Sequence, residues 1–390
     1  MPALAEIAPV YLDYAATTPV DPRVAATMAE YLTTDGIFGN AASVTHAYGR
    51  EAARRVEASR ADVAALIGAQ PAQIVFTSGA TESNNLAVFG ILRGHEDRGR
   101  HLVTSRIEHR AVLDPCRRLE KEGWSITWLE PDRGGLFDPE SLRGAIRPDT
   151  QLVSLIHAHN EIGTVQDLAA LGAICRERGV LFHSDAAQSV GKLPLDVATL
   201  PVDLLSFTAH KLYGPKGIGA LYVAPAARAR LAPQLHGGGQ EHGLRSGTLA
   251  NHQIAGFGAA ARLALAEAAT DAARIGQLRD QLWHRLAALE GVLRNGDAAR
   301  CLPGILNVSI AGVEGESLVT ALTQVALSTG SACSSAAREP SYVLRALGRS
   351  AELAESSLRL SLGRFSTEAE IERAASAIVQ AVRRLRALAP

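Results

Sequence analysis

Cysteine is scarce in this chain, and the four cysteines lie far apart. Cys116, Cys175, Cys301 and Cys333 are distributed over 390 residues, and none of them forms a CxxC pair. This usage argues against a disulfide framework and against a zinc site. We therefore expect no structural metal and a reducing, cytoplasmic compartment.

Long apolar runs and an excess of charge are also missing. No run approaches the roughly 18 apolar residues that a membrane-spanning helix needs, and residues 1–10 hold no basic stretch ahead of an apolar one. The formal net charge is −1, which gives no reason to expect nucleic acid or an anionic membrane as a partner. We expect no membrane segment and no targeting peptide.

Short β-branched runs alternate with helical patterns over the first two thirds of the chain. This alternation predicts an α/β fold with a parallel or mixed sheet covered by helices on both faces. We expect a large domain over residues 21–267 and a smaller α+β domain formed by residues 1–20 and 268–390. The predicted strands are 73–77, 101–105, 125–129, 151–157, 180–183, 204–207, 219–223, 305–310 and 358–362. The predicted helices are 83–93, 111–122, 168–178, 259–289 (with or without a break) and 368–388.

Two predicted strands end in side chains that suit a pyridine-type cofactor. Lys211 follows one strand and enters a glycine-rich turn, where a fixed and partly desolvated lysine can form a Schiff base. Asp185 follows another, where a carboxylate can pair with a pyridinium nitrogen, and Gln188 could donate to a ring oxygen. Taken singly, Lys211 could equally be a surface lysine, and Asp185 a helix N-cap.

Three further groups lie at predicted strand ends. Gly79, Ala80 and Thr81 separate a strand from a helix, which makes either an anion site of unsatisfied amides or an ordinary capped helix. His109 could stack on a flat ring and move protons, or be structural. Asn160 follows the next strand. Because ligands in open α/β sheets bind outside the carboxyl ends of strands, this convergence favours an active site.

Cys333 differs from the other cysteines in its surroundings. It lies among small polar residues in Ser328-Thr-Gly-Ser-Ala-Cys-Ser-Ser335. Such a segment should be mobile and accessible, which suits a reactive thiolate. Cys116 and Cys175 fall within helical patterns and are expected to be inert, and Cys301 has no assigned role.

Together these residues resemble the cysteine desulfurases of the IscS/NifS type, which are fold type I pyridoxal phosphate enzymes of the class V aminotransferase superfamily. The resemblance runs from Tyr11 to about Pro390, with Asn84 where the family often has Asp. It implies a mostly parallel seven-stranded sheet in the large domain. The matching blocks are 76–83, 108–109, 160–163, 188–192, 210–211, 236–239, 245–248 and 330–333.

The resemblance also implies a role for each residue. Lys211 would carry the cofactor and move the Cα proton, His109 would stack on the ring and deprotonate the substrate thiol, and Cys333 would take the sulfur. The carboxylate of L-cysteine would be held by Asn160 and Arg359. Pyridoxal 5′-phosphate would be bound by Ala80, Thr81, His109, Asp185, Gln188, Thr208, His210, Lys211 and, from the other subunit of a homodimer, Thr248.

The implied products are L-alanine and a persulfide on Cys333, which passes sulfur to an acceptor such as an iron–sulfur scaffold protein or to tRNA thiolation. Cys333 could also ligate a cluster transiently during transfer. A selenocysteine lyase or another class V enzyme stays open as an alternative, as does an inactive sulfur-relay or scaffold subunit. Relatives commonly continue beyond the position of Pro390 with a short tail, so the resemblance implies weaker scaffold docking or a different acceptor.

Overall fold

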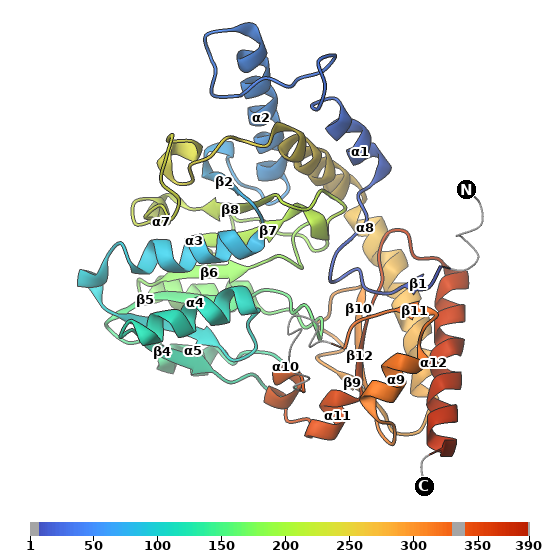
Figure 1. Cartoon of the computed structure of the whole chain (residues 1–390). Helices are drawn as coiled ribbons and strands as arrows, with labels where there is room; N and C mark the ends of the chain where they lie inside the picture. The colour runs from blue at the N-terminus through green and yellow to red at the C-terminus, as the bar shows by residue number, and fades with distance from the viewer. Residues whose placement is uncertain (1–7, 330–339, 389–390) are drawn as a thin grey trace.

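The structure is a computed structural model, and it describes residues 8–329 and 340–388 (Figure 1). Its centre is a seven-stranded sheet with the strand order β2-β8-β7-β6-β5-β3-β4. Neighbouring strands from β7 to β4 are parallel, whereas β8 is antiparallel to both β7 and β2. This confirms the expected α/β fold with a mostly parallel sheet. The strands are β2 (Ile74–Thr77), β3 (His101–Ser105), β4 (Ser125–Leu129), β5 (Thr150–Ile156), β6 (Leu181–Asp185), β7 (Leu204–Thr208) and β8 (Gly219–Val223).

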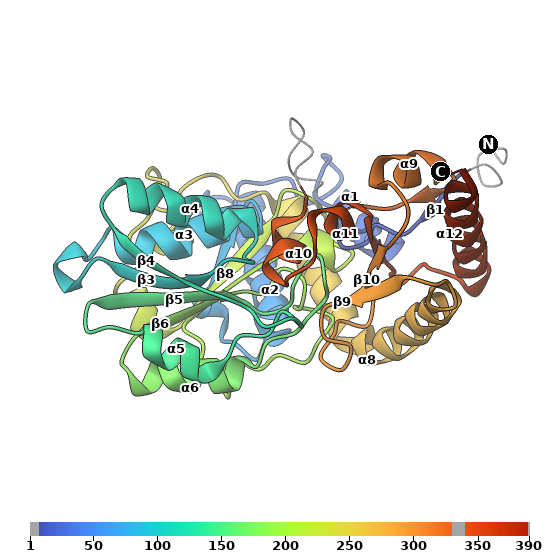
Figure 2. The same cartoon turned by 90° about the horizontal axis from the view of Figure 1, so that it is seen from below.

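Helices cover both faces of this sheet, because alternate residues of each strand point to opposite faces and both sets are apolar. In β5, Leu152 packs in the apolar cluster beneath α3 and α4, and Val153 packs in the cluster on the other face. Figure 2 shows α3 and α4 on one side of the sheet and α5 and α6 on the other. The helices of this part are α1 (Pro22–Ala29), α2 (Ala47–Ala65), α3 (Ala80–Leu92), α4 (Arg110–Lys121), α5 (Pro139–Ala145), α6 (Leu168–Glu177) and α7 (Pro225–Arg228).

A second layer of structure packs around a small antiparallel sheet with the order β12-β10-β9, beside a parallel pair of β1 and β11. Ile275 of α8, Leu306 of β10 and Ile378 of α12 belong to its separate apolar cluster. No helix in the described residues is both long and apolar enough to cross a membrane. The elements are α8 (Asn251–Ala287), α9 (Gly315–Ala321), α10 (Tyr342–Ala346), α11 (Ala351–Glu355), α12 (Glu368–Leu388), β1 (Val10–Tyr11), β9 (Val292–Asn295), β10 (Ile305–Ile310), β11 (Val325–Ala326) and β12 (Ser357–Ser361).

The two layers share α8, which runs unbroken from one to the other (Figure 1). The boundary expected between residues 267 and 268 falls inside this helix and stays a prediction. The short helix α10 packs with the large sheet rather than with the small one, because Val343 and Leu344 belong to the large apolar cluster. That contact brings the chain beyond residue 339 against the large sheet.

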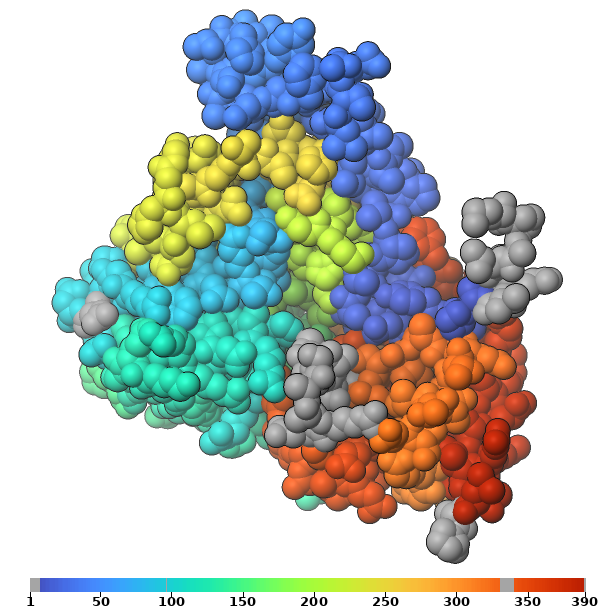
Figure 3. Space-filling view, viewed as in Figure 1, coloured from blue at the N-terminus to red at the C-terminus, as the bar shows by residue number. Residues whose placement is uncertain are grey.

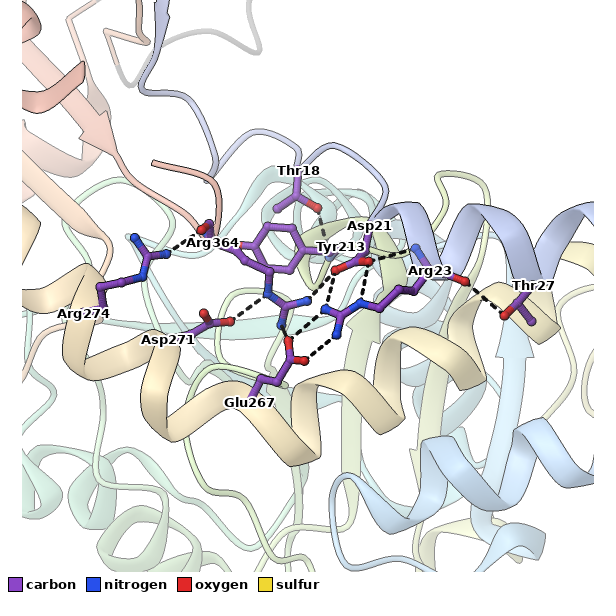
Figure 4. Close-up of polar contacts among 9 residues, drawn as sticks. All are labelled: Thr18, Asp21, Arg23, Thr27, Tyr213, Glu267, Asp271, Arg274 and Arg364. Carbon is purple, nitrogen blue, oxygen red and sulfur yellow. Dashed lines mark hydrogen bonds and ion pairs between the residues drawn. The ribbon is translucent and has the colours of Figure 1, made fainter. Parts of the chain in front are cut away.

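An ion-pair network around Tyr213, two residues beyond Lys211, joins the two layers (Figure 4). The Arg364 guanidinium donates to Asp21 at 2.9 Å and to Asp271 of α8 at 2.8 Å. It also lies 4.5 Å from the ring centroid of Tyr213, whose hydroxyl accepts from the Arg364 backbone N–H at 2.6 Å. Tyr213 has a φ of +65°, a strained conformation for a non-glycine residue that these contacts hold in place.

We expect Arg364→Ala to lower the free energy of unfolding by about 3 kcal/mol, because part-buried Asp271 loses its partner and buried Asp21 keeps only Arg23. Arg364→Lys should fall between the wild type and Arg364→Ala, since lysine keeps the charge but not the planar fork. Urea unfolding of the three proteins measures the effect. An Arg364→Ala protein as stable as the wild type would contradict this account of the junction.

Candidate active site

A cleft of about 580 Å³ opens at the carboxyl ends of the parallel strands, and it is lined by ten of the predicted site residues. Two predicted residues are not among them. Thr248 is exposed and does not line the cleft of its own chain, and Cys333 lies outside the described residues. The residues that meet in the cleft are Ala80, Thr81, His109, Asn160, Asp185, Gln188, Thr208, His210, Lys211 and Arg359.

One end of the cleft is shaped for an anion. Gly79 is the N-cap of α3, with a φ of +153°, and no side chain caps the first helical amides. A Cβ atom at Gly219 would lie 2.6 Å from the Cα of Gly79, so glycine at 219 allows the close approach of the two backbones, and glycine at 79 allows the positive φ. The amides of Ala80 and Thr81 are therefore left to bind a ligand, as a phosphate at a helix start requires.

Asp185 is the last residue of β6, which continues beyond its predicted end at residue 183. Its carboxylate is 3% exposed and accepts from the Asn84 side-chain amide at 2.7 Å and from the Ala187 N–H at 2.9 Å. No helix begins at Asp185, so the N-cap interpretation is wrong. The family often has Asp at the position of Asn84. In this chain the Asn84 amide donates a hydrogen bond to Asp185, whereas a second carboxylate at this position would repel Asp185.

His109 is the N-cap of α4, and its Nδ1 accepts from the Ala111 N–H at 3.1 Å. In the neutral ring the proton is therefore on Nε2. Burial lowers the pKa of His109, an effect that Asp185 opposes and Lys211 reinforces. The ring is thus neutral near pH 7, and it can accept a substrate proton only by releasing the Ala111 contact.

Lys211 lies half-buried at the end of the short turn after β7. Its Nζ donates to the carbonyl oxygen of Ala15, and to that of Ala16 at 2.6 Å. The Thr18 hydroxyl fixes the turn, since it donates to the His210 carbonyl at 3.0 Å and accepts from the Tyr213 N–H at 3.0 Å. These partners come from the N-terminal segment, and their contacts with the Lys211 turn were not predicted from the sequence.

Arg359 of β12 supplies the positive charge on the substrate side of the cleft. It is 5% exposed, and it donates to the Asp13 carboxylate at 2.8 Å and to the Asn160 carbonyl at 3.0 Å. Its Nε is buried without a hydrogen-bond partner in the described structure. A buried donor of this kind is suited to an anionic ligand.

Glu108, next to His109, is fully buried beneath the cleft. Its Oε1 accepts from Ser105 at 2.7 Å and from the Ile156 N–H at 2.9 Å, whereas Oε2 has no partner among the described residues. Burial raises the pKa of Glu108 to about 8. The side chain is therefore a neutral acid near pH 7.

This protonation makes stability depend on pH. A raised folded-state pKa contributes stability below the unfolded value near 4.5, and that stability is lost as pH rises towards 8. In Glu108→Gln the amide oxygen can still accept from the Ser105 hydroxyl and the Ile156 N–H. Because glutamine does not titrate, this variant lacks the pH-dependent contribution to stability. Between pH 5 and 8 the unfolding free energy of the wild type should fall relative to Glu108→Gln by up to about 1.4 kcal/mol per pH unit. Parallel curves in urea unfolding over this range would contradict the assignment.

The comparisons with known proteins agree with this geometry. The model of the aminotransferase class-V family matches residues 10–374. The chain is 56% identical to the cysteine desulfurase IscS of Shewanella sp. (strain ANA-3) over 98% of its own length and 95% of that relative. Among solved structures, a NifS-like protein superposes with a TM-score of 0.90 at 34% identity, covering 97% of this chain and 100% of the other. SspA in complex with cysteine matches with a TM-score of 0.81 at 38% identity, covering 92% and 99%.

The fold and the cleft are thus those of a class V aminotransferase. The chain belongs to the aminotransferase class-V family and, within it, to the cysteine desulfurases of the IscS type. The family, the fold class and the enzyme class expected from the sequence are confirmed.

Proposed function

We propose that the protein uses pyridoxal 5′-phosphate to convert L-cysteine to L-alanine and passes the sulfur to Cys333. The observation that carries the proposal is the meeting of Lys211, Asp185 and Arg359 in one cleft with an uncapped helix start. A flat, phosphorylated, pyridine-containing group fits this donor set. The helix start suits the phosphate, Asp185 suits the ring nitrogen, and Gln188 and His109 suit the ring.

The bound cofactor would supply an electron sink for charge developing at the substrate Cα. Lys211 would hold the cofactor and carry the proton to and from Cα, guided by the turn that Thr18 fixes. Arg359 and Asn160 would bind the substrate carboxylate, and the Nε donor of Arg359 gives that group an unused partner. His109 would cover the ring, and it could take the thiol proton only after its Nδ1 leaves Ala111.

The sulfur step would be a displacement. The Cys333 thiolate attacks the substrate sulfur, a sulfur–sulfur bond forms, and the carbon–sulfur bond breaks with its electron pair going to the substrate. Two proton transfers to the substrate then complete L-alanine. One L-cysteine and one protein thiol give one L-alanine and one protein persulfide, so no external oxidant is required. A sulfur-acceptor protein, such as an iron–sulfur scaffold, would remove the persulfide sulfur.

A selenocysteine lyase is the alternative from the same family. The test is to supply L-cysteine and L-selenocysteine in parallel, and to measure alanine and the mass of the Cys333 peptide with and without a reductant. A mass increase of one sulfur atom on that peptide with L-cysteine supports the desulfurase. Alanine formed only from L-selenocysteine, with an unmodified peptide, would contradict it.

A homodimer with shared active sites is part of this proposal. Exposed apolar side chains gather on the segment that connects α1 to α2 and on the first turn of α2. This part of the chain projects from the body in Figure 3. They are Leu32, Phe38, Val44 and Tyr48. Thr248 does not line the cleft of its own chain. Figure 3 shows the yellow part of the chain beside that projection. A second copy covering this face could bring its Thr248 to the anion end of the cleft.

Thr248→Ala should therefore raise the dissociation constant for pyridoxal phosphate by about tenfold, the scale of one hydrogen bond to a charged group. An absorbance titration of the cofactor-free protein measures this. Thr199→Ala is the control, because Thr199 is also exposed but lies away from the cleft. A fully active monomer in analytical ultracentrifugation, or an unchanged Thr248→Ala, would contradict the shared site.

A further inference from the structure

The residues on either side of the segment that carries Cys333 attach to the substrate side of the cleft. Before it, Ser328 accepts from the Arg359 backbone N–H at 2.7 Å. After it, the Ser341 hydroxyl donates to Glu161 Oε2 at 2.7 Å. Glu161 directly follows Asn160, whose carbonyl accepts from Arg359. Both attachments therefore lead to the pair Asn160 and Arg359.

The second attachment is buried and firmly held. Glu161 is 4% exposed and Ser341 is 3% exposed. The Glu161 N–H donates to His159 Nδ1 at 3.0 Å, and its carbonyl accepts from the Asn307 side chain at 3.2 Å. A carboxyl group buried at this depth is unfavourable unless it is hydrogen-bonded, and Ser341 supplies such a bond.

The Ser341 end of the Ser341–Glu161 hydrogen bond is held in place by α10. Ser341 is its N-cap, accepting from the Leu344 N–H at 3.3 Å. The Tyr342 hydroxyl donates at 2.7 Å to the carbonyl of Glu108, the neighbour of His109. Because Val343 and Leu344 also pack in the large apolar cluster, α10 cannot shift independently of the strands that end in the cleft.

We infer that Glu161 and Ser341 are positioning residues that tie the base of the Cys333 segment to the pair that would hold the substrate carboxylate. The inference rests on the proposed function. The sulfur of L-cysteine is at a fixed number of bonds from its own carboxylate. The substrate carboxylate and the base of the Cys333 segment would then be held by the same group of residues. This raises the effective concentration of the accepting thiol at the donor sulfur.

The test compares two N-cap serines in the holoenzyme. Ser341→Ala removes a helix cap and the bond to Glu161. Ser350→Ala removes only a cap, since Ser350 is exposed and accepts from the Leu353 N–H at 3.2 Å in the same way. After rapid mixing with equimolar L-cysteine, two quantities are measured: the rate of persulfide formation on Cys333, and the affinity for L-cysteine from the absorbance change on binding.

Ser341→Ala should slow persulfide formation by about tenfold, the scale of one buried hydrogen bond, with unchanged affinity for L-cysteine. Ser350→Ala should keep the wild-type rate. Glu161→Gln should also keep most of the rate, because its amide oxygen can still accept from Ser341. The double variant Ser341→Ala with Glu161→Ala should be no slower than Ser341→Ala alone, as expected for two groups that act through one bond.

Equal rates in Ser341→Ala and Ser350→Ala would overturn the inference and leave the proposed function standing. A loss of L-cysteine affinity as large as the loss of rate would also overturn it, because the pair would then only support the cleft. A wild-type protein that forms no persulfide would overturn both the inference and the proposed function.

Discussion

Replacing Lys211 with alanine should abolish covalent attachment of pyridoxal phosphate and lower alanine formation by about 10³-fold or more. The substitution removes the amine that would bind the cofactor and the group that would move the Cα proton. The remaining binding groups, at the start of α3 and at Asp185, stay in place. Cofactor should therefore still bind, but it should be lost on dialysis.

The chain offers an unusually clean readout for this experiment, because lysine occurs only at positions 121, 192, 211 and 216. Borohydride reduction of the reconstituted protein followed by peptide mapping should label Lys211 alone. Lys121→Ala is the control, since Lys121 lies on the exposed end of α4. Cofactor found on another lysine, or a Lys211→Ala protein that keeps its colour after dialysis, would refute the assignment.

The chain positions of the cleft residues were predictable because parallel strands end at one edge of a sheet. Asp185 and Lys211 each follow a short apolar run, and the pattern of such runs predicts the strand ends to within roughly two to four residues. The partners of these residues were not predictable. Asn84 contacts Asp185 across 101 positions of sequence, and Ser341 contacts Glu161 across 180. Such pairings depend on how helices pack on the sheet, which local periodicity does not specify.

The long helix α8 shows why element boundaries are harder. Its predicted start is residue 259, whereas the helix begins at Asn251. Gly256 and Gly258 lower helix propensity and so argue against the first turns. In the structure a Cβ at Gly258 would lie 2.8 Å from the Cβ of Ser59 in α2. These glycines allow the close approach of other segments, and tertiary packing outweighs their propensity.

Helix α2 is absent from the sequence-based prediction for a related reason. Ala52, Val56 and Val63 recur at helical spacing on its buried face. Arg60, on the same face, interrupts the apolar pattern. It is 3% exposed, and its guanidinium donates to Glu241 at 2.7 Å through two nitrogens. A buried ion pair with a residue 181 positions away makes an arginine tolerable there, and only the folded structure shows that partner.

Cys333→Ser should bind L-cysteine normally but form no protein persulfide, and its turnover should fall by at least about 10²-fold, since serine has no thiolate to attack sulfur. The other cysteines cannot replace it near neutral pH. Burial raises the pKa of Cys175 to about 12 and raises the pKa of Cys116 still further. Burial also raises the pKa of Cys301, whose thiol lies 3.5 Å from the Ile305 carbonyl and does not line the cleft.

The three single variants Cys116→Ser, Cys175→Ser and Cys301→Ser are therefore the matched controls, and each should keep most of the activity. The measurement is single-turnover alanine formation together with mass spectrometry of the cysteine-containing peptides. An extra sulfur atom on Cys301, or a Cys301→Ser protein as inactive as Cys333→Ser, would move the acceptor to a different part of the fold. Because Cys301 does not line the cleft, that result would also require the substrate sulfur to react outside the cleft that Arg359 lines.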